Sequence, residues 1–360
     1  MNCYIHVPFC AYKCGYCAFF SEVNRSKTVH NKYLDCLQKR LESKQCGPLK
    51  TLYIGGGTPT LLDLPELKRL ISILRNNLQY TPDCEISIEA NPETLTEEKV
   101  GLLRSFATRI SLGVQSFNPA LRESIGRKCS DEALWRAIKL ISEADFQHWN
   151  CDLIYSLPNE KLSDWLDDLH RAGDCGVDHV SCYSLTPEAD AAMGENFAED
   201  DERESEMYFA CEQVLSKYGI SRYEISNYAV SGAECKHNVN VWCGGLLRGE
   251  GPSAADFDGK NRHIEPASLS AWFAGEAPEL DEISCTARCN EIFAVNLRTV
   301  KGWTKNMWEK VPGCDRWANR VQIAENLQKN FPGCVEFNET SIKLSAKGLM
   351  YWNDIAESII

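Results

Sequence analysis

Short runs of apolar or alternating residues recur through the first two-thirds of the chain and predict β-strands. They lie at Tyr4–Val7, Leu52–Ile54, Glu85–Glu89, Arg109–Val114, Asn150–Tyr155 and His179–Leu185, with a seventh candidate at Tyr223–Ser226. Segments of helical periodicity separate them, at Lys32–Leu41, Leu64–Leu78, Glu97–Phe106, Asp131–Ala144, Leu162–Ala172 and Glu204–Tyr218. Alternation of strand and helix about every 30 residues predicts βαβ units and a parallel sheet. Six or seven such units favour a full or partial (β/α) barrel.

This alternation ends near Asn227, and a different pattern follows it. The next stretch is rich in Gly and Trp, and from about Leu269 the chain has mostly helical periodicity. The segment Val335–Asn353 is predicted to form a short strand pair followed by a helix. We therefore expect two domains, a barrel over residues 1–230 and a mainly helical C-terminal region over residues 231–360.

Polar residues gather where the predicted strands end. Gly55–Pro59 follows the second strand, Glu89–Glu93 closes the third, and Gln115–Phe117 closes the fourth. Asp152 and Tyr183 lie within the fifth and sixth strands. Because the active site of a parallel barrel forms at the carboxyl ends of its strands, these groups are predicted to meet in one enzyme-like cavity.

Composition narrows the class of protein. The 360 residues carry a formal net charge of -13, which argues against general nucleic-acid binding, since that needs a basic face. There is no apolar run approaching the roughly 18 residues of a membrane span, and Met1–His6 does not resemble a signal peptide. A cytoplasmic protein is expected. Most of the 18 cysteines stand singly among apolar residues, which is typical of buried thiols.

One group of cysteines breaks this scatter. Cys10-x3-Cys14-x2-Cys17 places three thiols in the loop directly after the first predicted strand. Thiolates bind iron–sulfur clusters, zinc or copper(I), and structural zinc normally takes four ligands. Three ligands favour a four-iron cluster with one iron open to a small molecule. Zinc, or a chance spacing without a metal, are the alternatives.

The cysteine spacing on a first βα loop resembles the signature of the radical SAM superfamily. The string Tyr4–Cys10 with Tyr16-Cys17 is similar to the branch that contains coproporphyrinogen III dehydrogenase and the HemW-like heme chaperones. The likeness extends through Gly113–Phe117, Asp152–Pro158, Tyr223–Asn227, His237-Asn238 and Leu297-Arg298. It implies a partial (β/α)6-type barrel with a C-terminal accessory domain, a [4Fe–4S] cluster on Cys10, Cys14 and Cys17, and S-adenosylmethionine (SAM) on its open iron.

The resemblance also implies which residues surround the cofactors. They are Tyr4, Tyr16, Phe19, Gly55, Gly56, Gly57, Thr58, Glu89, Gln115, Arg127 and Asp152. Glycine allows close approach of the backbone to a ligand, arginine can bind a carboxylate with two hydrogen bonds, and aspartate can accept from two hydroxyls. Each has an ordinary alternative: a tight turn for the glycines, a packing aromatic for Tyr16, a surface charge for Arg127 and an interior hydrogen-bonding residue for Asp152.

Two features of the sequence distinguish the dehydrogenase from the HemW-like heme chaperones. Phe19 stands where the dehydrogenase carries a fourth cysteine and the HemW-like proteins carry an aromatic residue. His237–Trp242 resembles a segment proposed to hold heme, with His237 as its iron ligand and Cys235 as an alternative, although Val241 replaces the usual Tyr there. Two further departures, Ala255 and Cys129, stand where relatives often carry His.

We therefore predict a heme chaperone that binds the cluster, SAM and heme or a porphyrin. Its expected partners are a heme-accepting protein and an electron donor such as flavodoxin or ferredoxin. Neither nucleic acid nor a membrane span is expected. The alternatives are a radical SAM methyltransferase or porphyrin-modifying enzyme and, more remotely, a structural protein whose cluster site is inactive.

Overall fold

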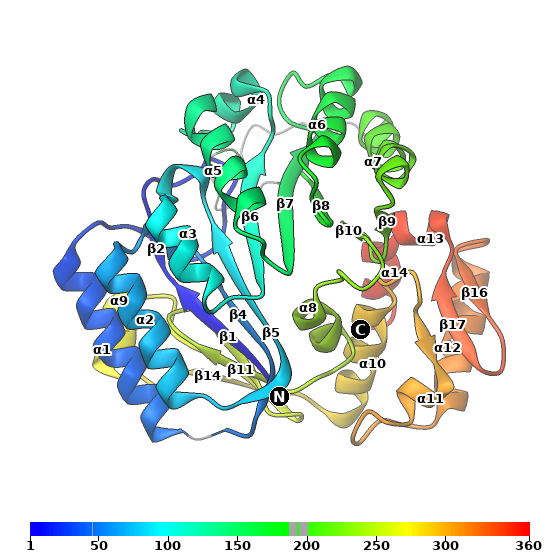
Figure 1. Cartoon of the computed structure of the whole chain (residues 1–360). Helices are drawn as coiled ribbons and strands as arrows, with labels where there is room; N and C mark the ends of the chain where they lie inside the picture. The colour runs from blue at the N-terminus through cyan, green and yellow to red at the C-terminus, as the bar shows by residue number, and fades with distance from the viewer. Residues whose placement is uncertain (45, 187–192, 194–200) are drawn as a thin grey trace.

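A single curved sheet organises most of the molecule. The computed structural model describes residues 1–44, 46–186, 193 and 201–360 (Figure 1). Across these residues the main sheet has twelve strands, in the order β14-β13-β12-β11-β1-β4-β5-β6-β7-β8-β10-β9. The strands from β1 to β8 in that order are parallel neighbours. Within the described residues the outer strands β14 and β9 do not pair with each other, so the expectation of a partial (β/α)6-type barrel is confirmed.

The parallel strands supply the frame of the barrel. Their bounds are Asn2–Val7 for β1, Leu49–Gly56 for β4, Tyr80–Ala90 for β5, Arg109–Gln115 for β6, His148–Tyr155 for β7 and His179–Ser184 for β8. The first five cover a predicted strand and are longer than it, because pairing with neighbours extends them, while β8 ends one residue before the predicted Leu185. The shorter strands are β2 (Phe9–Cys10), β3 (Glu22–Val23), β9 (Ser221–Arg222), β10 (Asn227–Ala229), β11 (Leu247–Glu250), β12 (Ala255–Phe257), β13 (Asn261–Ile264) and β14 (Glu279–Glu282).

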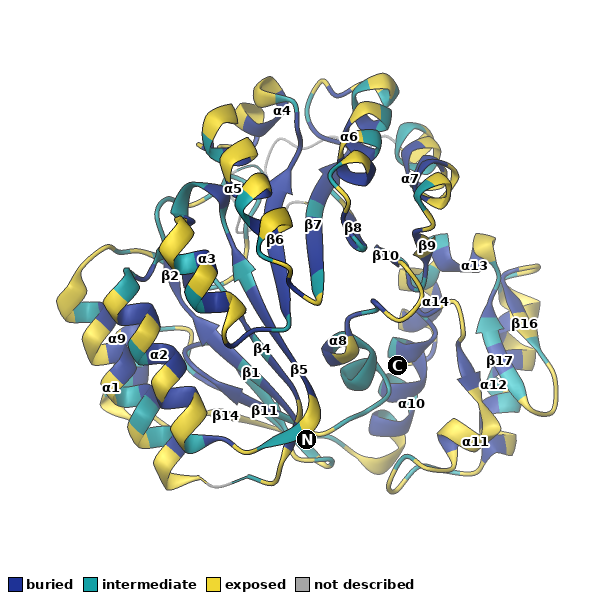
Figure 2. Ribbon diagram, viewed as in Figure 1, coloured by how far each residue is buried: buried dark blue, intermediate teal, exposed yellow. Residues whose placement is uncertain are grey.

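Helices cover the outside of the parallel strands (Figure 1). They are α1 (Lys27–Ser43), α2 (Leu64–Asn77), α3 (Glu97–Arg104), α4 (Pro119–Ser124), α5 (Asp131–Glu143), α6 (Leu162–Asp174) and α7 (Asp201–Leu215). Their outward faces are exposed while the strands beneath them are buried (Figure 2). The start of α2 shows why one of them begins where it does: the Asp63 side chain accepts from the Glu66 N–H, and the Glu66 side chain accepts from the Asp63 N–H, which forms a capping box.

The two faces of each parallel strand differ in polarity. On β4, Leu52 and Ile54 belong to the buried apolar core beneath the helices. Thr51 and Tyr53 alternate with them and therefore point to the opposite, inner face. Strands of a parallel sheet with two apolar faces usually read as continuous hydrophobic runs. The alternation in this sequence arises because the inside of the barrel is polar.

The prediction of a seventh strand is wrong. Tyr223–Ser226 connects the antiparallel strands β9 and β10 rather than forming a strand. The buried carboxylate of Glu224 holds this connection, since it accepts from the Ser226 N–H at 2.8 Å, the Asn227 side chain at 2.6 Å and Arg298 at 2.7 Å. A carboxylate-centred turn has the same alternation of polar and apolar residues as a strand.

The main sheet continues beyond residue 230. Strand β11 adds to β1 in parallel, and β12, β13 and β14 follow it in antiparallel order. The apolar core of this part reaches Trp272, and a separate core runs from Cys289 to Ile359. The packing therefore changes between residues 272 and 289, while the division at residue 230 stays a prediction.

The separate C-terminal core mixes helices with a small sheet (Figure 1). The order β15-β17-β16 forms this sheet, and the strand pair with a following helix that was predicted within Val335–Asn353 corresponds to β16, β17 and α13. The elements are α10 (Cys285–Asn296), β15 (Trp303–Thr304), α11 (Lys305–Trp308), α12 (Trp317–Asn330), β16 (Val335–Phe337), β17 (Ser341–Leu344), α13 (Ala346–Met350) and α14 (Trp352–Glu357). Among the described residues, no helix is both long and apolar enough to cross a membrane.

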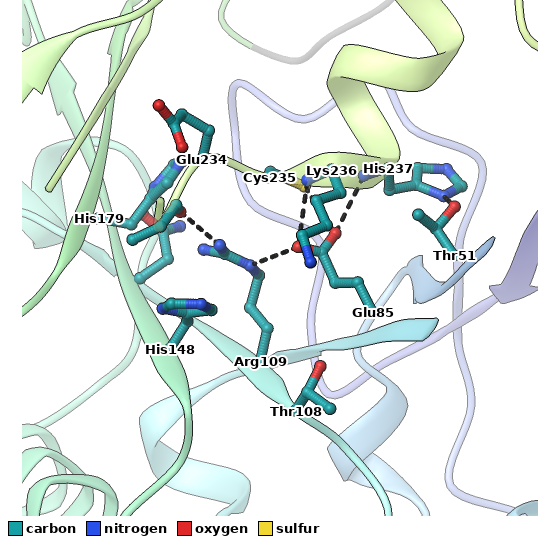
Figure 3. Close-up of polar contacts among 12 residues, drawn as sticks. Thr51, Glu85, Thr108, Arg109, His148, His179, Glu234, Cys235, Lys236 and His237 are labelled. Carbon is teal, nitrogen blue, oxygen red and sulfur yellow. Dashed lines mark hydrogen bonds and ion pairs between the residues drawn. The ribbon is translucent and has the colours of Figure 1, made fainter. Parts of the chain in front are cut away.

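Helix α8 (Lys236–Trp242) closes the amino-terminal end of the barrel. Its first backbone N–H groups, those of Lys236 and His237, donate to the Glu85 carboxylate at 3.1 and 3.0 Å (Figure 3). Glu85 also forms an ion pair with Arg109 at 3.4 Å, and both side chains are almost fully buried. Since a carboxylate at a helix N-terminus satisfies unpaired N–H groups and the helix dipole, Glu85 fixes α8 to strands β5 and β6.

We expect Glu85→Ala to lower the free energy of unfolding by about 3–5 kcal/mol, because it leaves the buried Arg109 charge without its partner. Urea unfolding followed by circular dichroism measures this change. Glu143→Ala is the matched control, since its ion pair with Lys139 is exposed and such pairs contribute at most about 1 kcal/mol. Equal effects of the two substitutions would contradict the account of the buried pair.

Candidate functional site

A cavity of about 450 Å³ opens at the carboxyl ends of the parallel strands. It lies at the opposite end of the barrel from α8. The wall contains most of the residues predicted for the site, namely Cys10, Cys14, Tyr16, Cys17, Phe19, Gly56, Gly57, Thr58, Glu89, Gln115, Arg127 and Asp152. The expected convergence of strand ends on one mouth is therefore present.

The cysteine loop is fixed to the barrel by backbone hydrogen bonds at both of its sides. The Thr58 N–H donates to the Phe9 carbonyl at 2.7 Å, which ties the start of the loop to the end of β4. Further on, the Gly15 N–H donates to the Ile125 carbonyl at 3.0 Å. The sequence between Cys10 and Cys17 is thus held over the cavity without regular secondary structure of its own.

Cys10, Cys14 and Cys17 are all half-buried along the cavity wall. Burial raises the pKa of the Cys17 thiol, while the nearby Lys13 opposes that shift. Among the described residues, no three His, Cys, Asp or Glu side chains are grouped as the ligands of one metal ion would be. In a four-iron cluster each thiolate binds a different iron, so its ligands do not have to meet at one point.

Two glycines bring the backbone close to the cavity. Gly56 has a φ of +110°, and a Cβ there would lie 2.8 Å from the His6 ring. A Cβ on Gly57 would lie 2.6 Å from the Phe9 carbonyl oxygen. Neither position has room for a side chain, so the backbone itself forms this part of the wall.

Glu89 faces the cavity from strand β5. Its carboxylate accepts from the Tyr53 hydroxyl at 2.9 Å and from the Gly56 N–H at 3.1 Å. Removal from bulk water raises the pKa of Glu89 to about 7, and the negative charge of Asp152 contributes to that rise. A carboxylate held in this way gains from a cationic ligand, because such a ligand favours its charged form.

Asp152 faces the same cavity from strand β7. Its two carboxylate oxygens accept from Asn150 at 2.7 Å and from Ser111 at 2.8 Å. Removal from water raises the pKa of Asp152, and these hydrogen bonds oppose the shift. A carboxylate with unused lone pairs at a cavity wall can accept from the hydroxyls of a ligand.

Arg127 lies between the cysteine loop and the part of the cavity wall that carries Glu89 and Asp152, which we call the carboxylate wall. Its guanidinium donates to the Asn91 side chain and to the Gly113 carbonyl, both at 2.7 Å, and points a third N–H at the Cys14 sulfur at 3.9 Å. Arg127 is buried, and its Nε has no hydrogen-bond partner among the described residues. Arg127 therefore lies inside the site rather than on the surface.

The charges of the cavity wall fit SAM. Among the described lining residues, Glu89, Glu93 and Asp152 supply three carboxylates, and Lys13 and Arg127 supply two cations. SAM carries a sulfonium, an ammonium and a carboxylate, so one ligand offers cations to Glu89 and Asp152 and an anion to Arg127. Opposite charges brought together out of bulk water stabilise one another.

Three predicted site residues lie outside the cavity wall. Tyr4 is on β1, where its hydroxyl lies 3.0 Å from His6 Nδ1, and Gly55 is packed so that a Cβ would meet the Glu89 carboxylate at 2.8 Å. His237 lies at the other end of the barrel, buried against Thr51 at 2.9 Å (Figure 3). Burial lowers the pKa of His237 to about 4, so this imidazole is neutral at physiological pH.

Comparisons with known proteins agree with this geometry. The Radical SAM superfamily model matches residues 4–172. The heme chaperone HemW of Mycobacterium tuberculosis strain H37Rv is 37% identical over 273 residues, which cover 72% of this chain and 70% of that protein. The chain belongs to the HemW family of radical SAM proteins. The heme chaperone HemW of Haemophilus influenzae is similar along almost the whole chain, with 29% identity, 99% coverage of this chain and 97% of that protein.

A solved structure shares the fold of this HemW family member. The coproporphyrinogen III oxidase HemN of Escherichia coli, a radical SAM enzyme, aligns with a TM-score of 0.84. The alignment covers 99% of this chain and 89% of that one at 21% identity. At this identity the likeness concerns the fold.

Sequence reasoning missed several residues that support the site of this HemW family member. Tyr53 donates to Glu89, Ser111 donates to Asp152, and Asn91 links Arg127 to the Thr58 hydroxyl, which accepts at 2.8 Å. Their position on the inner face of the strands was the available signal for Tyr53 and Ser111. Asn91 belongs to the strand-end segment Glu89–Glu93, so its place was indicated, although its partner was not.

We expect Glu89 to make the protein without ligand less stable as the pH rises. Its folded pKa of about 7 lies above the ordinary glutamate pKa of 4.5, so stability falls between these two pH values, by about 2 kcal/mol once screening by cavity water is allowed for. Urea unfolding at pH 5 and pH 8 measures this loss. Glu89→Gln should abolish that part of the pH dependence, and an unchanged slope in the variant would contradict the assignment.

Proposed function

We propose that this protein is a heme chaperone that binds a [4Fe–4S] cluster, SAM and heme, and passes heme to an acceptor protein. Cys10, Cys14 and Cys17 would hold the cluster, and the carboxylate wall with Arg127 would hold SAM. When bound, the cluster and SAM supply one-electron chemistry, while the protein positions them and excludes water. The observation that carries the proposal is that the three loop cysteines, Glu89, Arg127 and Asp152 line one cavity in a chain of the HemW family.

The side chain of Phe19, at the cavity mouth, is suited to contact with heme and cannot act as a further ligand of the cluster. Phe19 follows the cysteine loop and is 73% exposed, although large apolar side chains are usually buried. Its backbone carbonyl accepts from Lys13 at 2.5 Å, so the residue is anchored while its ring projects. An exposed aromatic ring at the mouth offers apolar surface to a flat macrocycle, whereas a cysteine there would offer a thiolate.

Heme ligation by His237 would require a change at the amino-terminal end of the barrel. The imidazole is 6% exposed, and its Nδ1 faces the Thr51 hydroxyl. Its ring also packs 5.2 Å from the Tyr53 ring, measured between centroids. In this proposal, α8 leaves its contacts with Glu85 and carries His237 from the amino-terminal end of the barrel towards the heme at the cavity mouth. The neutral state of the ring suits an axial ligand, since iron binds the unprotonated nitrogen.

Two macromolecular partners complete the proposal. A heme-accepting protein would take the heme from the chain, and an electron donor of the flavodoxin or ferredoxin kind would reduce the cluster. The cluster loop lies at the mouth of the cavity, where a donor can approach it, and Lys13 on that loop offers a positive charge. Donors of this kind would be recognised in part by charge, which affects the rate of encounter more than affinity.

An anaerobic hemin titration of the iron–sulfur-reconstituted protein, followed by absorbance with and without SAM, tests the chaperone function. We expect a saturable Soret shift near one heme per chain, lost in His237→Ala and kept in the control His263→Ala, whose imidazole is on β13 and partly exposed. Absence of saturable binding to the unmodified protein would refute the proposed function. Retained binding in His237→Ala would refute only the ligand assignment.

A radical SAM enzyme, either a methyltransferase or a porphyrin-modifying catalyst, is the second candidate. It is favoured by the intact set of SAM-directed groups, in particular Glu89, Arg127 and Asp152, which pure heme transfer would not need. Chromatography of reduced reactions with SAM and a porphyrin separates the two candidates. Cleavage of SAM that a porphyrin accelerates would favour the enzyme, and unaccelerated cleavage would favour the chaperone.

A further inference from the structure

A chain of hydrogen bonds runs through the inside of the barrel to the cavity carboxylate of Asp152. We propose that Asn150, His179 and Tyr223 are positioning residues that hold Asp152 in the orientation needed to bind SAM. The inference rests on the SAM site of the proposed function. None of these three residues is part of the cavity wall, so any influence on a ligand there acts through the wall residues that Asn150 contacts, Asp152 and Ser111.

Asn150 is the first member of the chain. Its amide nitrogen donates to Asp152 Oδ1 at 2.7 Å and to the Ser111 hydroxyl oxygen at 2.7 Å. Ser111 in turn donates to Asp152 Oδ2 at 2.8 Å. One oxygen is thereby tied to the same strand, β7, and the other to the neighbouring strand, β6. A side chain with both oxygens engaged has little rotamer freedom left, which is how supporting residues pre-organise a binding group.

His179 fixes the direction in which the Asn150 amide points. Its Nδ1 lies 2.7 Å from Asn150 Oδ1, and because an amide oxygen only accepts, Nδ1 must carry the proton. His179 is 2% exposed, and burial holds its pKa well below the usual range. The ring is therefore the neutral Nδ1–H tautomer, which keeps the Asn150 oxygen toward His179 and its N–H groups toward Asp152.

Tyr223 completes the chain at the amino-terminal end of the barrel. With Nδ1 protonated, His179 Nε2 accepts, and the Tyr223 hydroxyl donates to it at 2.9 Å. The Tyr223 oxygen then accepts from the Cys235 N–H at 3.4 Å, at the residue that precedes α8. His179 and Cys235 are both labelled in Figure 3. The successive hydrogen bonds therefore all donate in the same direction, from the backbone N–H before α8 towards the Asp152 carboxylate.

The first test compares SAM affinity by calorimetry in the reconstituted, full-length protein. Tyr223→Phe keeps the ring and removes the hydroxyl, and Asn150→Ala removes the direct donor. We expect SAM to bind about fivefold more weakly to Tyr223→Phe and about tenfold more weakly to Asn150→Ala, the range expected for loss of one or more hydrogen bonds. The matched control is Tyr80→Phe, whose hydroxyl donates to the Leu74 carbonyl outside the site, and it should bind SAM unchanged.

The second test needs no SAM and therefore separates the two proposals. Carbon-13 NMR of labelled aspartate follows the pKa of Asp152, which should rise in Asn150→Ala because a donor to the carboxylate is lost, and stay constant in Tyr80→Phe. If the unmodified protein binds no SAM, the proposed function fails. The pKa of Asp152 then still tests whether the hydrogen-bond chain holds its carboxylate. Unchanged SAM affinity in both chain variants, or an unchanged Asp152 pKa in Asn150→Ala, would overturn the inference.

Discussion

Two carboxylates enclosed in the barrel, Glu89 and Asp152, are the constraint on which the rest of the site depends. Each is kept from bulk water, and the charge of Asp152 raises the energy of the charged form of Glu89. Folding with such groups is unfavourable unless donors and cations surround them. Tyr53, Gly56 and Ser111 supply the donors. These donors compensate the negative charge of the two carboxylates only in part, and the cavity is therefore suited to a cationic cofactor.

A second group of buried charges lies at the other, amino-terminal end of the barrel. There, Glu85 and Arg109 neutralise each other, and Glu85 also caps α8. The buried charges at the amino-terminal end are therefore neutralised by the chain itself, while those at the cavity gain a cation only from a ligand. A parallel barrel places function at the carboxyl ends of its strands, and the distribution of charge in this molecule follows the same division.

Much of the site could be predicted from the sequence because it depends on local patterns. The cysteine loop is contiguous, Glu89 and Gln115 follow from the rule that strand ends converge, and Asp152, which lies within its strand, follows from the family resemblance. The support from Ser111 could not be predicted, since Ser111 on β6 meets Asp152 on β7 only through the register between these two strands. Register depends on the whole sheet, so a single sequence does not reveal which inner-face residues become neighbours.

The same limit explains the errors in the fold. Tyr223–Ser226 alternates like a strand, but the buried charge of Glu224 bends it into a turn. Strand β11 has the polar sequence Leu247-Arg248-Gly249-Glu250, which gives no strand signal, and it becomes one by pairing with β1. His237 is far from the cysteine loop in sequence, and its place behind the wall residue Tyr53 rather than on the cavity wall could be found only in three dimensions.

Calorimetric titration of SAM into the reconstituted protein at pH 7, in buffers of different ionisation enthalpy, tests the central claim most directly. Because a bound cation lowers the pKa of Glu89 from about 7, the account predicts that SAM binding releases protons. In Glu89→Gln this release should disappear while the heat of binding remains. Binding without proton release in the unmodified protein would contradict the claim that the enclosed carboxylates hold the cationic cofactor.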